Sequence, residues 1–280
     1  MSKRKKADSR DIGLDLGITF SKYFFKTDHL HYGYWTNGLE VDISNLARAQ
    51  ENYANFLMSQ IPEKVSAILD VGCGTGKLAS RLAAKGYSVD CVSPSKLLTR
   101  HARELLGGKS HIYESKYEEV VTEKKYDMIL FSESFQYVDM EKAFRQNRAF
   151  LNDNGYMLIS DFFKTDAKGE SPLGGGHFLA EFYKTIEKHP FRLLKDIDIT
   201  KETAPNLKLV DDFLTQVGVP TWTACLDYLD IKFPLLSKVI KWKFRKKIDK
   251  INRKYFSGSR NADNFAVYKS YRFLLYQKTN

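Results

Sequence analysis

The feature that most constrains the fold is the segment 68–76, which reads Ile-Leu-Asp-Val-Gly-Cys-Gly-Thr-Gly. Residues 67–71 form a short apolar run of the kind expected for a buried parallel strand. We expect a helix to follow at 77–85, with Gly86 as its C-terminal stop. Glycines between a strand and a helix let the backbone turn tightly and approach a ligand, to which the helix offers unpaired N–H groups. The segment therefore predicts a ligand-binding strand–turn–helix unit.

Similar strand–helix units repeat along the following chain. We expect further strands at 87–92, 110–114, 126–132 and 156–160, and helices at 96–106 and 140–151. Repeated units of this length are typical of an α/β fold with a mostly parallel sheet and helices on both faces. The segments 191–197 and 268–277 are also predicted strands, and the last would complete a terminal antiparallel pair. A helix beginning near Asp42 or Ser44 and ending before Pro62 would form an N-terminal helical cap.

The composition indicates a globular protein, because 43% of the 280 residues are hydrophobic and 28% are charged. No apolar run approaches the roughly 18 residues of a membrane span. The formal net charge of +10 favours anionic partners, which include nucleic acid, an anionic membrane surface and an acidic substrate. No apolar stretch follows the basic residues 3–6, so we expect a disordered arm rather than a secretory signal. Cys73, Cys91 and Cys225 lack metal-ligand spacing and are typical of a reduced, cytoplasmic protein.

The chain divides into four predicted parts. Residues 1–41 form a basic arm and an aromatic leader, and residues 42–199 form the α/β core. Residues 200–263 are expected to form a helical lid or substrate insert, because a structureless loop of that length would be unusual. Residues 264–280 supply the C-terminal strand that completes the core sheet.

The spacing of the glycines separates two classes of ligand. A dinucleotide-binding turn has its third glycine one residue later, at the position occupied here by Lys77. A pyrophosphate would also meet the carboxylate of Asp70 beside the turn. S-adenosylmethionine (SAM) instead carries a cationic amino group and a sulfonium, for which a carboxylate at the strand end is suitable. The motif therefore favours SAM over a dinucleotide.

The stretch from Asp70 to Gly76 closely resembles motif I of the class I SAM-dependent methyltransferases. The order of the predicted elements resembles their Rossmann-like, seven-stranded fold, and Tyr126-Asp127 and the segment 151–155 are similar to their later landmarks. The resemblance implies a methyltransferase that uses SAM and releases S-adenosylhomocysteine. It assigns cofactor binding to the turn, namely Asp70, Gly72, Cys73, Gly74 and Gly76.

A narrower resemblance lies in the leader. The run 31–35, His-Tyr-Gly-Tyr-Trp, resembles the leader of the cyclopropane-fatty-acid-synthase and tocopherol-methyltransferase relatives, and it implies that Tyr32 and Trp35 cover the methionine end of SAM. The run 92–95 resembles the end of the second strand in the same group. Most class I enzymes have an acidic residue where Ser93 stands, so ribose binding would depend on Ser93, Pro94, Ser95 and backbone groups.

The resemblance also implies an adenine site after the third strand. The family usually has an aspartate there, whereas this sequence has Ser115-Lys116-Tyr117. Tyr117 is a candidate to stack on the adenine ring, and a surface tyrosine is the equally simple alternative.

The chemistry of methyl transfer marks catalytic residues only weakly, because the protein mainly aligns the acceptor and excludes water. Ser132 and Glu133 follow the fourth strand, at the carboxyl end of the sheet, where Glu133 would orient the acceptor or accept its proton. A solvated or helix-capping carboxylate is the equal alternative for Glu133. Asp161 ends the fifth strand, and His177 follows three glycines. His177 is a candidate general base, although a lone histidine is more often structural. The histidines show no metal spacing, so no metal is predicted.

The run 238–254 contains nine basic residues and a single acidic one, Asp249. On a helix it places apolar side chains along one stripe, and it includes Trp242. Such a helix suits an anionic membrane interface, which would make the protein peripheral at the membrane. The alternative is an ordinary lid helix whose stripe packs on the core.

These features predict a SAM-dependent methyltransferase acting on a small, apolar or amphipathic acceptor such as a lipid, isoprenoid or natural product. Two alternatives remain open. One is a nucleic-acid methyltransferase that uses the basic C-terminal stretch as a phosphate-binding surface, although the segment 132–137 lacks the Pro-Pro-aromatic pattern of amino-methylating enzymes. The other is a SAM-binding relative that transfers no methyl group.

Overall fold

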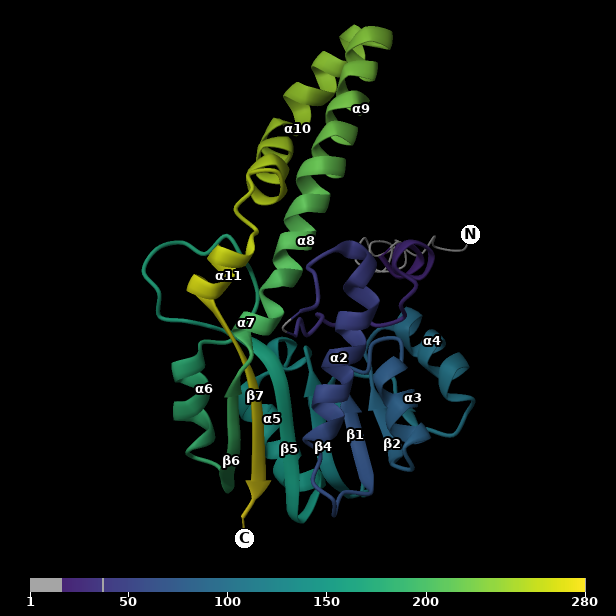
Figure 1. The fold of residues 1–280 in the computed structure, drawn as a ribbon, viewed down its shortest axis with the longest axis vertical. Coiled ribbons are helices and arrows are strands. Elements are labelled where there is room, and N and C mark those ends of the chain that lie inside the picture. The colour runs from purple at the N-terminus through teal and green to yellow at the C-terminus, as the bar shows by residue number, and fades with distance from the viewer. Residues whose placement is uncertain (1–16, 37, 280) are drawn as a thin grey trace, which may run out of the picture.

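A computed structural model describes residues 17–36 and 38–279 of the chain. Its centre is a seven-stranded sheet in the order β3-β2-β1-β4-β5-β7-β6, drawn in Figure 1. The strands are β1 (Ala67–Val71), β2 (Ser88–Val92), β3 (Ile112–Tyr113), β4 (Tyr126–Ser132), β5 (Leu151–Lys164), β6 (Phe191–Asp198) and β7 (Lys269–Lys278). β1 to β5 pair in parallel, and β7 pairs antiparallel with both β5 and β6. This is the Rossmann-like α/β sheet that the repeated strand–helix units predict.

Helices connect these strands. They are α2 (Leu46–Ser59), α3 (Lys77–Ala84), α4 (Lys96–Leu106), α5 (Met140–Phe150), α6 (Leu179–Ile186), α7 (Thr200–Thr203), α8 (Pro205–Phe213), α9 (Val219–Lys232), α10 (Pro234–Tyr255) and α11 (Ala262–Tyr268). Of these, α2 to α6 cover the two faces of the sheet. The side chain of Asp42 accepts a hydrogen bond from Ser44 N at the start of a short 3₁₀ turn (Ile43–Asn45), which leads into α2. The predicted N-cap is therefore present, but it caps this turn rather than α2 itself.

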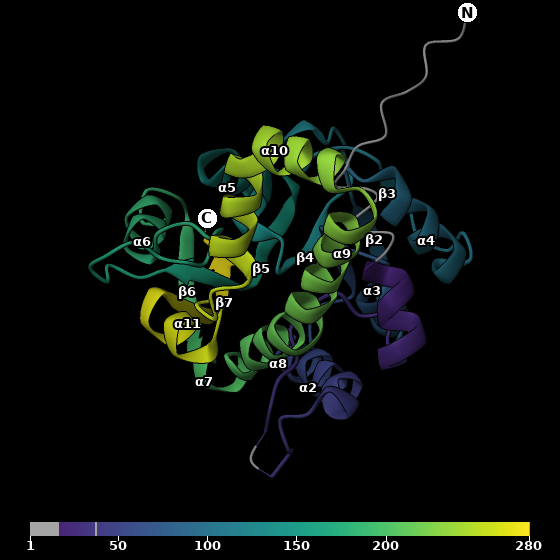
Figure 2. The same cartoon turned by 90° about the horizontal axis from the view of Figure 1, so that it is seen from above.

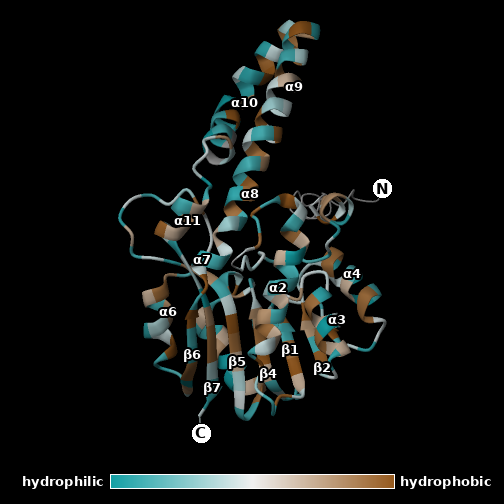
Figure 3. Cartoon of the chain, in the orientation of Figure 1, coloured by the Kyte–Doolittle hydropathy of each residue, from teal (hydrophilic) through white to brown (hydrophobic). Residues whose placement is uncertain are grey.

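Two hydrophobic cores result, because successive strand residues point to opposite faces of the sheet. Ile68 of β1 packs with α2, α3 and α4 on one face, whereas Leu69 packs with α5 and α6 on the other. Both side chains are fully buried. Figure 3 shows this as hydrophobic colour along β1, β4 and β5. The apolar composition of the run 67–71 follows from this burial on two sides.

Some predicted elements differ in length or number. β3 is only two residues long, whereas β5 extends well beyond the predicted 156–160 because β7 pairs with it as far as Lys164. The last two strands do pair antiparallel, but β7 lies between β5 and β6 instead of forming a hairpin at the edge. Helix α6 has no counterpart in the sequence prediction.

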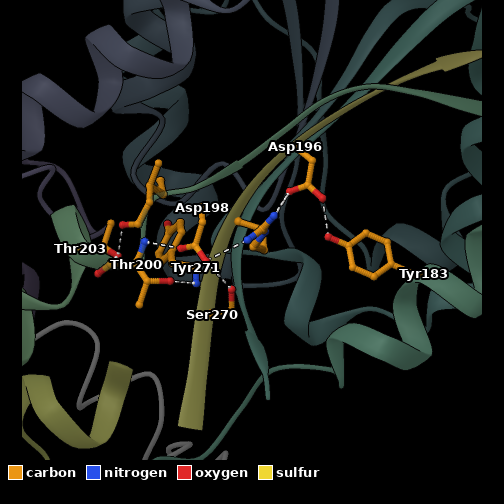
Figure 4. Close-up of polar contacts among 9 residues, drawn as sticks. Tyr183, Asp196, Asp198, Thr200, Thr203, Ser270 and Tyr271 are labelled. Carbon is orange, nitrogen blue, oxygen red and sulfur yellow. Dashed lines mark hydrogen bonds and ion pairs between the residues drawn. The ribbon is translucent and has the colours of Figure 1, made fainter. Parts of the chain in front are cut away.

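Polar contacts anchor the insert that separates β6 from β7, as Figure 4 shows. The backbone N–H of Tyr271 donates to Thr200 Oγ1 at 2.7 Å, and Asp198 accepts from the backbone N–H of Thr200 at 2.9 Å. Arg272 of β7 pairs with both Asp196 and Asp198 of β6. These bonds hold the start of the insert against the sheet.

Beyond this anchor, the insert is a helical hairpin rather than a single lid helix. α8 and α9 continue one another through a π-helical turn (Leu214–Gly218), and α10 returns alongside α9. Figure 1 shows the α9–α10 pair projecting away from the sheet instead of lying flat over it, and Figure 2 shows from above that α8 and α9 run on in one line. The predicted helical run near 235–255 is confirmed as α10, whose neighbour is α9 rather than the sheet.

Candidate active site

A cavity of about 660 Å³ opens at the carboxyl ends of β1 and β4. Its walls come from the leader, the glycine turn, the segment after β4, and the base of the helical hairpin with its continuation into β7. The residues that matter for the chemistry are His31, Tyr32, Asp70, Gly72, Cys73, Gly74, Ser132, Glu133, Phe162, Arg260, Phe265 and Lys269. Ligands of open α/β sheets bind at this edge, so the cavity is the candidate active site.

The glycine turn begins the cavity wall. Gly72, Gly74 and Gly76 have backbone φ values of 78°, 57° and 82°, a conformation that residues other than glycine rarely adopt. A Cβ at position 72 would lie 2.4 Å from the Cβ of Ser134, so the turn needs glycine there for space as well. The bare backbone of Gly72 and Gly74 lines the cavity, whereas Gly76, also predicted to bind the cofactor, lies outside the lining and packs against Ala102. This bare backbone leaves room for a ligand to approach main-chain atoms directly.

Two buried acceptors beside this turn have no partner among the described residues. They are Oδ2 of Asp70 and Nε2 of His31, both on residues that line the cavity. Burial raises the pKa of Asp70 to about 7. Burial, followed by the neighbouring His29, lowers the pKa of His31 to about 3, so His31 is neutral. A buried, unpaired polar atom is costly, so both positions fit a ligand that brings a cation or a hydrogen-bond donor.

The leader forms the roof of this part of the cavity and is firmly tied down. Thr75 Oγ1 donates to the carbonyl of Asp28 at 2.7 Å, which joins the leader to the glycine turn. Gln50 Nε2 of α2 donates to the carbonyl of His31 at 2.7 Å. Gly33 exchanges two hydrogen bonds of 2.8 Å with the buried side chain of Asn206 in α8. Residues 28–33 of the leader are therefore bonded to three separate parts of the chain, namely the glycine turn, α2 and α8.

Glu133 stands at the centre of the cavity wall. Its φ of 56° is unusual for a residue with a side chain, and such strain concentrates at functional sites. Its Oε1 accepts from the backbone N–H of Tyr32 at 2.7 Å and from the Tyr271 hydroxyl at 2.8 Å. Burial raises the pKa of Glu133 to about 8 in spite of these two bonds. The carboxyl group can therefore change its protonation state near neutral pH.

A buried hydroxyl network supports Glu133 from behind. The hydroxyl groups of Tyr271 and Tyr53 lie 2.8 Å apart, and Tyr53 also donates to Ser160 Oγ at 2.8 Å. Burial raises the pKa of both tyrosines well above the ordinary value, so both remain neutral. Neutral hydroxyl groups can donate toward Glu133 without adding charge.

Asp161, by contrast, does not line the cavity and is almost completely buried. It accepts hydrogen bonds from the backbone N–H and the side-chain amide of Gln136, at 3.0 and 3.2 Å, and from the N–H of Phe162 at 2.8 Å. Burial raises its pKa to about 7. Asp161 thus holds two residues that line the cavity, Gln136 and Phe162, without lining it itself.

The far end of the cavity is aromatic and cationic. The Tyr32 ring lies 6.3 Å from Phe162 and 6.0 Å from Phe265, measured between centroids. Lys269, the first residue of β7, is 1% exposed; its Nζ donates to the carbonyl of Gly175 at 2.6 Å and lies 5.2 Å from the Phe162 ring centre. Burial, followed by the charge of Lys164, lowers the pKa of Lys269 to about 8. This end suits a molecule with an apolar body and a polar group.

Two predicted site residues lie outside the cavity lining. His177 places Nε2 3.1 Å from the carbonyl of Phe135 and 3.0 Å from that of Val138, so its N–H is shared between two backbone acceptors. Trp35 is buried in a small cluster with Ala49 and Leu209. The structure therefore places His177 in a bridging position within a loop and Trp35 in packing behind the leader.

The residues predicted for the ribose and the adenine also lie outside the lining. Ser95 caps α4 by accepting from Leu98 N at 3.4 Å, and Ser93 lies buried beside it, with Pro94 exposed between them. Ser115 and Lys116 stand partly or fully exposed after β3. Tyr117 is 2% exposed, and its hydroxyl donates to Asn147 Oδ1 within the core. The side chain of Tyr117 is therefore not on the surface, and it does not reach the cavity.

Several lining residues were missed by the sequence reasoning, namely Phe162, Arg260, Phe265, Lys269 and the supporting Tyr271. All but Phe162 come from residues 260–271, at the end of the insert and the start of β7, where no motif marks them. The lysine near the start of the predicted strand 268–277 was an available signal, because buried lysines are rare.

Neither a metal site nor a helix able to span a membrane is present among residues 17–36 and 38–279. No group of three or more histidine, cysteine, aspartate or glutamate side chains there has the arrangement of a metal site. None of the helices in that part of the chain is both long and apolar enough to span a membrane.

Comparison with known proteins places this geometry in context. A family model described as a methyltransferase domain matches residues 45–195. The ubiquinone biosynthesis O-methyltransferase of Rickettsia conorii is 34% identical over 103 residues. The match covers 35% of this chain and 35% of that relative, so the chain spans about a third of the relative's length. Among solved structures, the [4+2]-cyclase SpnF aligns with a TM-score of 0.68 at 15% identity, over 96% of this chain and 93% of that one. The geranyl diphosphate C-methyltransferase of Streptomyces coelicolor A3(2) aligns with a TM-score of 0.65 at 14% identity, over 98% and 94%.

Proposed function

The chain belongs to the methyltransferase-domain family, in which SAM supplies the methyl group, and we propose that it methylates a small amphipathic acceptor in the cavity between Asp70 and Lys269. The single observation that carries this proposal is that one cavity joins the bare glycine turn, the buried carboxyl of Glu133 and an aromatic wall. Its volume, about 660 Å³, lies within the range of small-molecule sites.

The cofactor half of the cavity fits SAM. Oδ2 of Asp70 and Nε2 of His31 are buried acceptors that lack partners, and the amino group of SAM would supply the missing donors. The glycines of the turn leave room for the nucleoside against the backbone. When bound, SAM supplies an electrophilic methyl group on a sulfonium. The protein's own part is to hold that group, orient the acceptor and exclude water.

The acceptor half suits an apolar molecule with one polar end. Tyr32, Phe162 and Phe265 would contact its apolar body, while Lys269 and Arg260 would meet its polar or anionic group. In the described part of the chain, neither Lys269 nor Arg260 forms an ion pair with a carboxylate. Curated relatives support the same chemical class, because the Rickettsia protein is named for ubiquinone biosynthesis and another for O-methylkolavelool.

Oxygen is the acceptor atom we propose, with Glu133 as the general base. Both hydrogen bonds to this carboxylate end on Oε1, which leaves Oε2 available to take the proton of a hydroxyl group. A pKa of about 8 gives Glu133 enough basicity for that step near neutral pH. Tyr271 and the N–H of Tyr32 would stabilise the carboxylate form before the transfer.

The test is methyl transfer from radiolabelled SAM to a panel of phenols, quinols, prenyl alcohols and fatty acids, with calorimetry of SAM binding in parallel. We expect SAM to bind and a hydroxyl-bearing amphipathic compound to become labelled. Glu133→Gln should keep its SAM affinity but lose about 10²- to 10⁴-fold in kcat. Absence of SAM binding, or labelling confined to RNA, would contradict the proposal.

The two alternatives predict different outcomes in the same assay. A nucleic-acid methyltransferase would label RNA with a steep dependence on salt. A non-methylating relative would bind SAM but form no S-adenosylhomocysteine with any acceptor. The structural likeness to a cyclase bears only on the fold, since one fold carries many reactions.

A further inference from the structure

The α9–α10 hairpin ends in a tip far from the sheet, as Figure 1 shows. The 22 residues of α10 alone give a length of about 33 Å at 1.5 Å per residue. Only the base of the hairpin reaches the cavity, through Tyr255 at the end of α10 and Arg260 beyond it. The tip therefore has no role in forming the cavity wall, and its surface properties need another explanation.

Large apolar side chains gather on the tip and are exposed. Ile231, Leu235 and Trp242 are 79%, 80% and 81% exposed, so about four-fifths of each residue's surface is in contact with solvent. Phe233, Leu236 and Val239 are at least half exposed beside them. Figure 3 shows this hydrophobic colour at the end of the hairpin. Clustered exposure of this kind marks an interaction surface.

Basic residues surround this apolar tip. Between Tyr228 and Lys247 the chain carries seven lysine and arginine residues, namely Lys232, Lys238, Lys241, Lys243, Arg245, Lys246 and Lys247. The only acidic residue in that stretch, Asp230, is bonded to Lys241 and to Ser237 Oγ. The outward charge of the tip is therefore strongly positive.

The same bonds make the tip a defined surface. Asp230 at the end of α9 reaches across to Ser237 and Lys241 of α10, which closes the turn. The N–H of Phe233 donates to the carbonyl of Leu229 at 2.9 Å, and that of Ser237 donates to the carbonyl of Phe233 at 2.8 Å. The apolar side chains are thus presented together on an ordered helical turn.

We propose that the hairpin tip docks on the surface of an anionic lipid bilayer. Ile231, Leu235 and Trp242 would enter the interface between headgroups and acyl chains, where tryptophan is favoured. The surrounding lysines would lie at the level of the anionic headgroups. Exposed apolar side chains ringed by positive charge match this partner in both respects.

Other partners match only one of these properties. A nucleic acid would use the positive charge but leave the apolar tip in water. A second copy of the chain would cover the apolar tip, but it would bring two strongly basic surfaces together. Docking on lipid goes beyond the proposed methyl transfer and does not depend on it, although the hairpin rises from the end of the sheet where the cavity opens.

The test is co-sedimentation of the full chain with vesicles of phosphatidylcholine alone and with 30% phosphatidylglycerol added, roughly the anionic fraction of a charged leaflet. We expect binding to the anionic vesicles, weakened by high salt, and a blue shift of tryptophan emission. The variant Ile231→Ser/Leu235→Ser/Trp242→Ser should bind at least tenfold more weakly. The variant Lys238→Glu/Lys243→Glu/Lys246→Glu should lose binding to a similar extent or more.

Matched control variants carry the same kinds of substitution at exposed positions outside the hairpin. Val121→Ser/Leu105→Ser/Ile43→Ser alters three other exposed apolar residues, and Lys85→Glu/Lys109→Glu/Lys188→Glu changes the net charge equally. Both should bind vesicles like the unchanged protein. Equal binding by tip variants and controls would overturn the proposal, as would no binding at all. A dimer in light scattering that the tip serines dissociate, without vesicle binding, would instead assign the tip to a second copy.

Discussion

The Tyr271 hydroxyl donates to Glu133 Oε1 at 2.8 Å, although the two residues are 138 positions apart in the chain. Tyr271 belongs to β7 and Glu133 follows β4, so the contact exists only because β5 alone separates these strands in the sheet. A carboxyl group whose pKa lies near the working pH is thereby given a fixed, neutral donor.

This contact predicts the pH dependence of activity. Burial raises the pKa of Glu133 to about 8, and only its carboxylate form can accept a proton, so kcat/KM should rise with pH up to about 8 and then level off. Tyr271→Phe removes a donor to the carboxylate and should move this limb upward by about one pH unit. Tyr183→Phe, which removes a hydroxyl bonded to Asp196 instead, should leave the limb in place. A limb unchanged in Tyr271→Phe would remove Glu133 from the base role.

The buried carboxyl group of Asp70 should lower the free energy of unfolding of the ligand-free protein, although it should favour SAM binding. Burial raises its pKa from 3.8 to about 7, so unfolding releases a proton in this window and the free energy of unfolding falls as pH rises from 4 to 7. Asp70→Asn should therefore increase the free energy of unfolding of the ligand-free protein by about 2 kcal/mol at pH 8, with little change at pH 4. Calorimetry should show at least about tenfold weaker SAM binding. A destabilised variant with normal SAM affinity would contradict both expectations.

His177 should behave as a loop bridge. Its ring N–H is shared between the carbonyls of Phe135 and Val138, so His177→Ala should lower the free energy of unfolding by about 1–2 kcal/mol. Because Gly174 and Gly175 of the same loop line the cavity, KM for the acceptor should rise while kcat changes little. A general base would show the opposite split, with a loss in kcat of about 10²-fold or more. Steady-state kinetics beside thermal melting distinguishes the two roles.

Gly72 should tolerate a side chain far less than another glycine of similar backbone conformation. Gly72→Ala has to accommodate both a φ of 78° and a Cβ only 2.4 Å from that of Ser134. Gly107→Ala meets a φ of 59° but open space. Denaturant melts should show a loss of about 1 kcal/mol for Gly107→Ala and at least about 3 kcal/mol for Gly72→Ala. Similar losses would mean that the close approach of Ser134 is not a constraint.

The sequence by itself determined the parallel core and the glycine turn after β1. β1 and the turn after it are encoded within ten residues, because a strand buried on both faces must be apolar and a turn with positive φ values needs glycine. The boundaries of α4 and β4 were predictable for the same reason, since local periodicity and helix-ending glycines depend on neighbours in the chain. Asp70 was identifiable because it lies directly before the turn.

Only the tertiary structure decided the aromatic and cationic end of the cavity and the exposure of the hairpin. Because β7 pairs with β5, Tyr271 reaches Glu133 and Lys269 reaches the Phe162 ring. This pairing is long-range, and no local sequence pattern predicts it. An amphipathic stripe in α10 is equally compatible with packing on the sheet or on another helix, and its partner proved to be α9. Local sequence sets which surfaces are apolar, whereas the free energy of packing the whole chain selects which of them meet.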